Sequence, residues 1–341
     1  MLKLIRYTLE PRVIAYPELS SLILCLLLAV GLAALCFGGD WLARGAGSLA
    51  LLWKISPVVV GLTIVSIATS MPEMITAIIA AAKGNSGLAV GNIIGSNLGN
   101  IGLILGIAAL ITPIRIQWRL IRQEVPLLLL ITLLFSLLCL IGYTYTGALG
   151  RIEGILLLAG AVAYLVFLTV QARGTKRAIE EEYEDELANP IQNIWICLGL
   201  VLIAGVALWI GAELLVNSSV VLARRMDISD ELIGLTIVAI GTSLPELAAS
   251  VAAALRKQSD IIAGNIVGSN VFNMLLVGGG VAAVYPVQLE GKLFLLEYPA
   301  MILLTLLLWV LFFTQRKVSR MEGGLLLVLY GLILTLATIN Q

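Results

Sequence analysis

Two glutamates lie deep inside apolar segments, where a carboxylate is costly and is usually functional. Glu73 follows Pro72, and Glu246 follows Pro245. A proline inside a helix donates no amide hydrogen and clashes with the carbonyl four residues earlier. We therefore expect a broken helix at each position, with a free backbone carbonyl one turn before the glutamate. Neither glutamate has a basic residue near its depth in the same segment, so a structural ion pair lacks its other half.

Hydroxyl and amide side chains accompany these glutamates at helical spacing. One turn before the glutamates, on the same helical face, are Thr69 and Ser70, and Thr242 and Ser243. The next apolar segment of each half carries polar side chains four residues apart, which are Ser96 and Asn100, and Ser269 and Asn273. Carboxylate, hydroxyl and amide oxygens are the ligands of hard cations such as Na⁺ and Ca²⁺. The pattern predicts a cation site made of oxygen atoms only.

The role of four neighbouring asparagines stays open at this point. They are Asn92 and Asn265, on the same polar faces, and Asn97 and Asn270, one residue to the side. Such amides either coordinate the cation or hold helices together by interhelical hydrogen bonds. Glu124 and Glu297 differ from the central pair because each precedes a proline by two residues, as is typical of a helix start. We interpret these two as structural.

The composition is that of a membrane protein. Of 341 residues, 60% are hydrophobic and 12% are charged, against about 25% charged in an average soluble domain. This excludes a disordered chain, a disulfide scaffold and an ordinary cytosolic enzyme. The 21 basic and 21 acidic residues cancel, so no charge excess suggests a nucleic-acid partner. The four cysteines lie in apolar runs, and the absence of histidine removes the commonest transition-metal ligand and proton shuttle.

The apolar runs are long and continuous, which predicts membrane-spanning helices rather than a β-barrel. We expect an all-α membrane protein with ten transmembrane helices, the second and seventh of them broken. The expected spans lie near residues 18–43, 56–82, 86–111, 124–143, 151–171, 192–215, 229–255, 259–284, 296–315 and 322–340. A charged linker, 172–191, separates a first half (1–171, with a short N-terminal segment) from a second half (192–341).

The two halves are repeats of one another. Residues 61–106 align with 234–279 at a constant offset of 173, with 22 of 46 positions identical. Five helices per half make the second half enter the membrane from the opposite side, so the repeats are inverted, as in many secondary transporters. The loops on the linker side carry 13 Lys and Arg, against 8 on the side of the termini. Because basic residues stay inside, we expect a plasma (inner) membrane protein with both termini outside and the linker in the cytoplasm.

The repeated motifs GLTIVSIATSMPE (61–73) and GNIIGSNLGN (91–100), with their second copies, resemble those of the cation/Ca²⁺ exchanger superfamily, which includes the Na⁺/Ca²⁺ exchangers. The resemblance covers essentially the whole chain. It implies ten helices in two inverted halves, with ion sites between the second, third, seventh and eighth helices. The implied ligands are Glu73, Glu246, Thr69, Ser70, Ser96, Asn100, Thr242, Ser243, Ser269 and Asn273, with the backbone carbonyls of Ser66 and Ala239.

The resemblance also implies the activity, which is Na⁺/Ca²⁺ antiport by alternating access, with the first and sixth helices sliding over the other eight. It implies no enzyme activity and no cofactor, and we expect the protein to function as a monomer in the bilayer. Two positions depart from the usual motifs. Ala68 replaces a glycine, and Asn273 stands where some members have an aspartate that K⁺-dependent exchangers need. The second departure favours K⁺-independent exchange.

Other functions remain as alternatives. The nearest is a Ca²⁺/H⁺ exchanger on the same scaffold, because burial disfavours the charged form of a carboxyl group and lets protons compete. A cation channel is conceivable, although a charge-balanced pair of carboxylates argues against it. An intramembrane hydrolase would need a serine with a base or paired aspartates. The chain has no histidine, no deep lysine and no Gly-x-Ser-x-Gly sequence to supply them.

Overall fold

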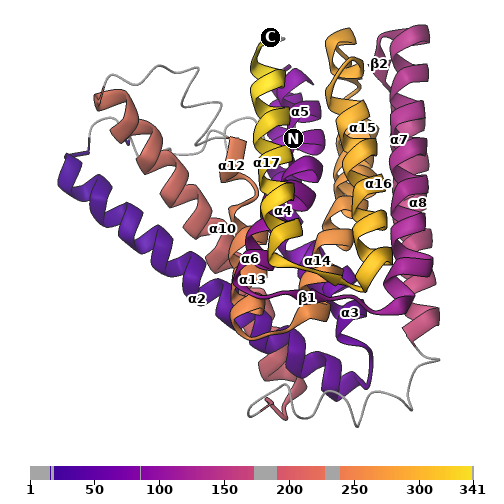
Figure 1. Cartoon of the computed structure of the whole chain (residues 1–341). Helices are drawn as coiled ribbons and strands as arrows, with labels where there is room; N and C mark the ends of the chain where they lie inside the picture. The colour runs from indigo at the N-terminus through magenta and orange to yellow at the C-terminus, as the bar shows by residue number, and fades with distance from the viewer. Residues whose placement is uncertain (1–15, 17–18, 85, 173–189, 227–238, 340–341) are drawn as a thin grey trace.

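The computed structural model describes residues 16, 19–84, 86–172, 190–226 and 239–339, which are almost entirely helical (Figure 1). The first half comprises α2 (Ser21–Trp53), α3 (Pro57–Val60), η2 (Gly61–Val65), α4 (Ser66–Ala82), α5 (Ser86–Gly99), η3 (Asn100–Ile104), α6 (Leu105–Ile111), β1 (Ile114–Arg115), η4 (Leu120–Glu124), α7 (Val125–Thr146), β2 (Ala148–Leu149) and α8 (Arg151–Ala172). The second half comprises α10 (Ile194–Arg225), α12 (Ala239–Gly241), α13 (Leu244–Leu255), α14 (Ser259–Phe272), η6 (Asn273–Gly278), α15 (Gly279–Val284), β3 (Val287–Gln288), η7 (Gly291–Phe294), α16 (Glu297–Gln315), β4 (Lys317–Val318) and α17 (Arg320–Ile339).

Within the described residues, nine helical stretches are long and apolar enough to span a membrane. They match nine of the ten expected spans. The remaining span, expected over 229–255, lies partly outside the described residues, and its described part contains the shorter apolar helix α13. The all-α membrane architecture is thus confirmed.

The first and sixth helices are longer than expected. Helix α2 has 33 residues and α10 has 32, whereas hydropathy alone ended the corresponding spans near residues 43 and 215. The carboxylate of Asp40, inside the expected span, accepts hydrogen bonds from the guanidinium group of Arg256. Helix α2 ends only at Lys54, which adopts the left-handed conformation.

Helices α2 and α10 form a pair that lies obliquely beside the more upright helices (Figure 1). Their contact depends on glycine. A side chain at Gly31 would begin 2.8 Å from the carbonyl oxygen of Gly211, and one at Gly211 would begin 2.9 Å from that of Gly31. Both distances are too short for a carbon atom, so the two backbones touch directly. The pair contacts the remaining helices chiefly through α13, and to a smaller extent through α3 and α4.

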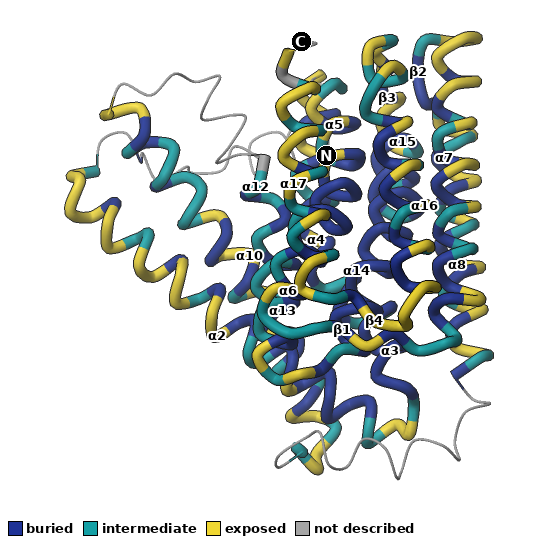
Figure 2. Tube along the Cα trace, viewed as in Figure 1, coloured by how far each residue is buried: buried dark blue, intermediate teal, exposed yellow. Residues whose placement is uncertain are grey.

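Two short strand pairs connect the halves. Strand β1 pairs with β4 through Ile114 and Val318, and β2 pairs with β3 through Leu149 and Val287. In the repeat alignment β1 corresponds to β3, since their residues differ by 173. The two pairs lie at opposite ends of the helices (Figures 1 and 2). Equivalent strands at opposite ends are the arrangement expected of inverted halves.

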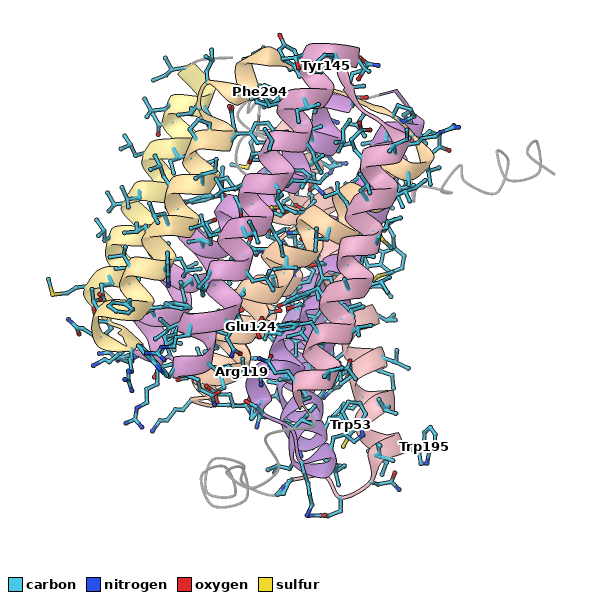
Figure 3. The ribbon with its side chains drawn as sticks, turned by 90° about the vertical axis from the view of Figure 1, so that its right-hand side faces the viewer. Trp53, Arg119, Glu124, Tyr145, Trp195 and Phe294 are labelled. Carbon is cyan, nitrogen blue, oxygen red and sulfur yellow. The ribbon has the colours of Figure 1, made fainter. Side chains whose placement is uncertain are left out.

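Burial separates central helices from outer ones (Figure 2). Most of the stretches Ser86–Ile111 and Ser259–Val284 are buried, whereas most of the other spans are exposed along their apolar side chains. Aromatic side chains mark the two ends of the molecule, with Trp53 and Trp195 at one end and Tyr145 and Phe294 at the other (Figure 3). Aromatic residues at both interfaces are typical of membrane proteins.

Candidate functional site

The polar residues predicted to bind cations lie on the central helices α4, α5, α13 and α14, which contact one another. Three π-helical segments adjoin them. Segment η2 precedes α4, while η3 and η6 begin at the equivalent residues Asn100 and Asn273. A π-helical turn inserts an extra residue into the helix and is common at functional sites. The irregular backbone therefore recurs at matched positions of the two repeats.

The two proline-containing helices differ from each other. In the second half, Thr242 and Ser243 form a turn between α12 and α13, so this helix is interrupted as expected. In the first half, α4 is continuous from Ser66 to Ala82 with Pro72 inside it, and the irregular segment is η2. The carbonyl oxygen of Ala68, four residues before Pro72 and therefore the one expected to be free, lies 3.8 Å from where a side chain at Gly205 of α10 would begin.

The central pair of glutamates is buried, and each carboxylate is only 1% exposed. The two carboxyl groups lie close enough to influence each other electrostatically. Ser70 of the first repeat donates from Oγ to Oε1 of Glu246 at 3.1 Å. Both carboxylate oxygens of Glu73 and Oε2 of Glu246 have no hydrogen-bond partner among the described residues. A buried anion without partners is costly, so this pair of carboxylates has the charge and free oxygen atoms that a cation requires.

Amide and hydroxyl oxygens extend the cluster. Asn100 Nδ2 donates to Asn270 Oδ1 at 3.5 Å, which leaves Asn100 Oδ1 without a partner in the described structure. Neither side-chain polar atom of Asn273 has a described partner. Ser243 Oγ donates to Ser96 Oγ at 3.5 Å. Both contacts join residues of opposite repeats.

Asn265, which the sequence left open, is the most connected side chain of this cluster. Its Oδ1 accepts from Thr69 Oγ1 at 3.4 Å and from Ser269 Oγ at 3.3 Å. Ser66 Oγ lies 3.5 Å from the same oxygen but donates its proton to the carbonyl oxygen of Gly61 at 2.7 Å. Its Nδ2 donates to Ser250 Oγ at 3.2 Å. A hydroxyl whose proton is taken by an acceptor keeps its oxygen lone pairs free for a cation. The sequence signal that could have assigned Asn265 to the cluster is its place four residues before Ser269 in the repeated motif.

The equivalent residue Asn92 makes a different contact. Its Nδ2 donates to the backbone carbonyl of Glu73 at 3.3 Å, and no hydroxyl donates to it among the described residues. Part of the difference between Asn92 and Asn265 follows from the residue that is available to accept a hydrogen bond from the side-chain amide nitrogen. Ser250 anchors Asn265, whereas the position equivalent to Ser250 is Ala77. The same residue type therefore has two roles in the two repeats.

The structure thus gathers most of the expected residues in one buried cluster. Buried members are Ser66, Thr69, Ser70, Glu73, Ser96, Asn100, Ser243, Glu246, Ser269 and Asn273. Thr242 is half-buried in the turn before α13, and Ala239 begins α12. No side-chain hydrogen bond of Thr242 occurs within the described part of the chain.

The two outer glutamates do not join this cluster. Glu297 lies in the first turn of α16, as expected. Glu124 is buried where η4 passes into α7 and interacts with Arg119 at 3.7 Å. Tyr164 of α8 donates to Glu124 at 3.2 Å. Figure 3 shows Arg119 and Glu124 together toward one end of the molecule. The hydrogen bond from Tyr164 connects the start of α7 with α8.

Comparisons with known proteins agree with this arrangement. The family model described as sodium/calcium exchanger protein matches residues 23–170 and 196–339. The putative antiporter CaxA of Alkalimonas amylolytica is 37% identical over 324 residues, covering 91% of this chain and 97% of the relative. The sodium/calcium exchanger MaX1 of Methanosarcina acetivorans is 28% identical, covering 89% of this chain and 95% of the relative.

A solved structure has the same fold. The sodium-calcium exchanger NCX_Mj, soaked with zero Na⁺ and Ca²⁺, is similar with a TM-score of 0.78 and 30% sequence identity, over 94% of this chain and 100% of that chain. These neighbours are membrane transporters rather than enzymes. With the family model covering both repeats and the buried cluster lying where they meet, the chain belongs to the sodium/calcium exchanger family.

Proposed function

We propose that this protein is a secondary antiporter that exchanges Na⁺ for Ca²⁺ at the buried cluster between α4, α5, α13 and α14. The observation that carries the proposal is the pair of neighbouring carboxylates, Glu73 and Glu246, with three oxygen atoms that lack partners in the described structure. Two carboxylates give a charge of about −2 when both are ionised. One Ca²⁺ or two Na⁺ would neutralise it, so the two ions are expected to exclude each other.

The proposed ligands are the residues predicted from the sequence. They are the side chains of Glu73, Glu246, Thr69, Ser70, Ser96, Asn100, Thr242, Ser243, Ser269 and Asn273, and the backbone carbonyls of Ser66 and Ala239. Their oxygen-only chemistry suits hard cations. The amide at Asn273, in place of a third carboxylate, supports exchange without K⁺. No resident cofactor is part of the proposal.

The same charges account for strict exchange. An empty site would leave two ionised carboxylates unpaired in a low-dielectric interior, at several kcal/mol for each ion. Movement of the empty carrier is therefore suppressed, while neutralised states cross. We propose that access alternates by sliding of the α2–α10 pair over the other helices. This is supported by the separate packing of the pair, whose two backbones are in direct contact.

We propose that the protein lies in the plasma membrane as a monomer, with the linker end in the cytoplasm. Helix α8 ends, and α10 begins, at the end of the molecule where β1 pairs with β4 (Figure 1). Basic residues are frequent at this end, and include Arg115, Arg119, Arg122, Arg316, Lys317 and Arg320. Because basic residues stay inside, their position supports a cytoplasmic linker and external termini.

A Ca²⁺/H⁺ exchanger is the second candidate, because a proton could bind to either of the two neighbouring carboxyl groups. The deciding experiment measures radiolabelled Ca²⁺ uptake into proteoliposomes. An outward Na⁺ gradient is imposed with the proton gradient collapsed, and then a proton gradient is imposed without Na⁺. Uptake driven by the Na⁺ gradient alone supports the proposal. Uptake that needs the proton gradient rejects it in favour of proton coupling.

A further inference from the structure

A cluster of cations lies at the end of the molecule where β1 pairs with β4. We define the basic patch as Arg115, Trp118, Arg122, Arg316 and Lys317. The guanidinium groups of Arg122 and Arg316 each lie 4.4 Å from the centroid of the Trp118 ring. The four basic side chains are exposed, and none forms an ion pair with an acidic side chain in the described part of the chain. Their charge is therefore not compensated within that part.

The basic patch lies at the level where spans end. The apolar stretches Ser86–Ile111 and Gly291–Gln315 end beside it, and Leu120–Thr146 and Arg320–Ala337 begin beside it. The Trp118 ring packs against Phe313, with 6.1 Å between ring centroids. An indole in contact with both an apolar ring and guanidinium groups is typical of the boundary between acyl chains and headgroups.

The repeat provides an internal comparison for this patch. The opposite end of the molecule carries the same strand pairing, between β2 and β3. The offset of 173 makes Gln288, Gly291 and Leu295 equivalent to Arg115, Trp118 and Arg122. Gln288 pairs with Ala148 as Arg115 pairs with Lys317, so the strand register makes Gly147 and Ala148 equivalent to Arg316 and Lys317. None of them is basic or aromatic, and the strands still pair in the same way. The fold of this turn therefore does not require the cations or the tryptophan.

Arg316 also occupies a backbone conformation that suits glycine. Its φ angle is +50°, in the left-handed region, and the equivalent Gly147 has φ of +72°. A side chain in this region is sterically unfavourable for most residues other than glycine. Arginine is nevertheless present at the position that holds its guanidinium group over Trp118. Local strain of this kind points to a function for the side chain.

We propose that the basic patch binds the phosphate headgroup of an anionic phospholipid. Guanidinium groups bind phosphate oxygens in bidentate geometry, and basic pockets at helix ends recognise anionic headgroups. Trp118 holds two such groups on one ring, with Arg115 and Lys317 on the neighbouring strands. The inference does not depend on which ions the protein transports. The competing occupant is the acidic run of the linker, residues 180–186, which the test includes as an outcome.

The test measures thermal unfolding of the purified full-length protein in neutral detergent while phosphatidylglycerol or phosphatidylcholine is added. A ligand that binds the native state raises the midpoint in proportion to its occupancy. The variant combines Arg122→Gln with Arg316→Gly, the residue found in the other repeat. The matched control, Lys83→Gln with Lys292→Gln, removes two cations near the opposite end. We expect phosphatidylglycerol to stabilise the wild-type protein and the control more than phosphatidylcholine does.

In the patch variant, we expect the half-saturating concentration of phosphatidylglycerol to rise about fivefold for each cation removed. This factor corresponds to the ~1 kcal/mol that each basic residue near an anionic surface contributes to binding. Without lipid, Arg316→Gly alone should unfold at the same or a higher temperature than the wild type. A lower temperature would make the side chain structural and overturn the proposal. Equal responses of the patch variant and the control would also overturn it.

Two further arms separate other anions from the lipid. Inorganic phosphate at the same concentrations should not reproduce the stabilisation, and an equal effect would replace a lipid site by a general anion site. A variant with the acidic residues of 180–186 changed to glutamine should respond to phosphatidylglycerol as the wild type does. If only this variant responds, the linker and not a lipid occupies the patch, and the proposal is wrong.

Discussion

Replacing Asn265 by alanine tests whether one amide orients the proposed hydroxyl ligands. Asn265 Oδ1 accepts hydrogen bonds from Thr69 at 3.4 Å and from Ser269 at 3.3 Å. Without this acceptor, the hydroxyl protons are free to turn toward the bound cation, which repels them. Each hydrogen bond of this kind contributes about 1 kcal/mol, and outer partners of metal ligands change metal affinity about 10- to 100-fold.

The expected effect is larger for Na⁺ than for Ca²⁺. Neutral oxygen atoms form a greater share of the ligands of a monovalent ion, whereas attraction to the two carboxylates dominates for a divalent ion. In Asn265→Ala we expect the half-saturating Na⁺ concentration to rise about tenfold, the lower end of the range for such outer partners. The half-saturating Ca²⁺ concentration should rise less. Both values come from radiolabelled Ca²⁺ uptake into proteoliposomes, with Na⁺ and Ca²⁺ varied in turn.

The chain itself supplies the controls. Asn92→Ala removes the equivalent amide, which donates to the backbone carbonyl of Glu73 and accepts from no hydroxyl in the described structure. It should leave the Na⁺ dependence close to that of the wild type. Ser250→Ala introduces the residue that the first repeat has at this position and should give an intermediate shift, because Asn265 loses its anchor. Equal shifts for Asn92→Ala and Asn265→Ala, or an unchanged Na⁺ dependence in a folded Asn265→Ala protein, would refute the reasoning.

Further predictions concern the carboxylates, the helix contacts and the ion pair. Glu73→Gln and Glu246→Gln should each abolish Na⁺-driven Ca²⁺ uptake, and uptake retained by both would reject the assignment of the site. Gly268→Ala should lower the free energy of unfolding by about 1–3 kcal/mol through overpacking, or impair transport, because the added carbon would lie 2.3 Å from Ser66 Oγ. Gly280→Ala is the control: its added carbon meets no described atom within 4 Å, so the unfolding temperature should not change. Glu124→Gln should lower the unfolding temperature because it breaks the ion pair with Arg119. The Na⁺ dependence of Ca²⁺ uptake should stay unchanged, and a changed dependence would connect this ion pair to the cation site.

The sequence predicted the cluster because its two copies could be compared. Glu73 and Glu246 stood out as charges at matched depth, and the spacing of four residues identified the facing stripe at Ser96 and Asn100. The family and the membrane architecture were likewise predicted and are confirmed. The ligand roles of individual residues remain a prediction.

What the sequence missed depends on contacts between distant segments. The expected first span ended near residue 43, just before Arg44, whereas α2 continues to Trp53. Proline predicted a break at residue 72, but the irregular turn lies in η2 and the helix continues through Pro72. Asn92 and Asn265 are identical in type and position within the motif. Only the packed structure distinguishes an amide that donates to a backbone carbonyl from one that accepts from two hydroxyls.

The crossed strand pairs have a consequence for how such a protein could arise. Each strand of one half finds its partner in the other half, and so does each glutamate of the central pair. A single five-helix unit would be left with two open strand edges and half a binding site. An ancestor of that size would have been complete only as a dimer of two copies inserted in opposite directions, and gene duplication then fixed both directions in one chain.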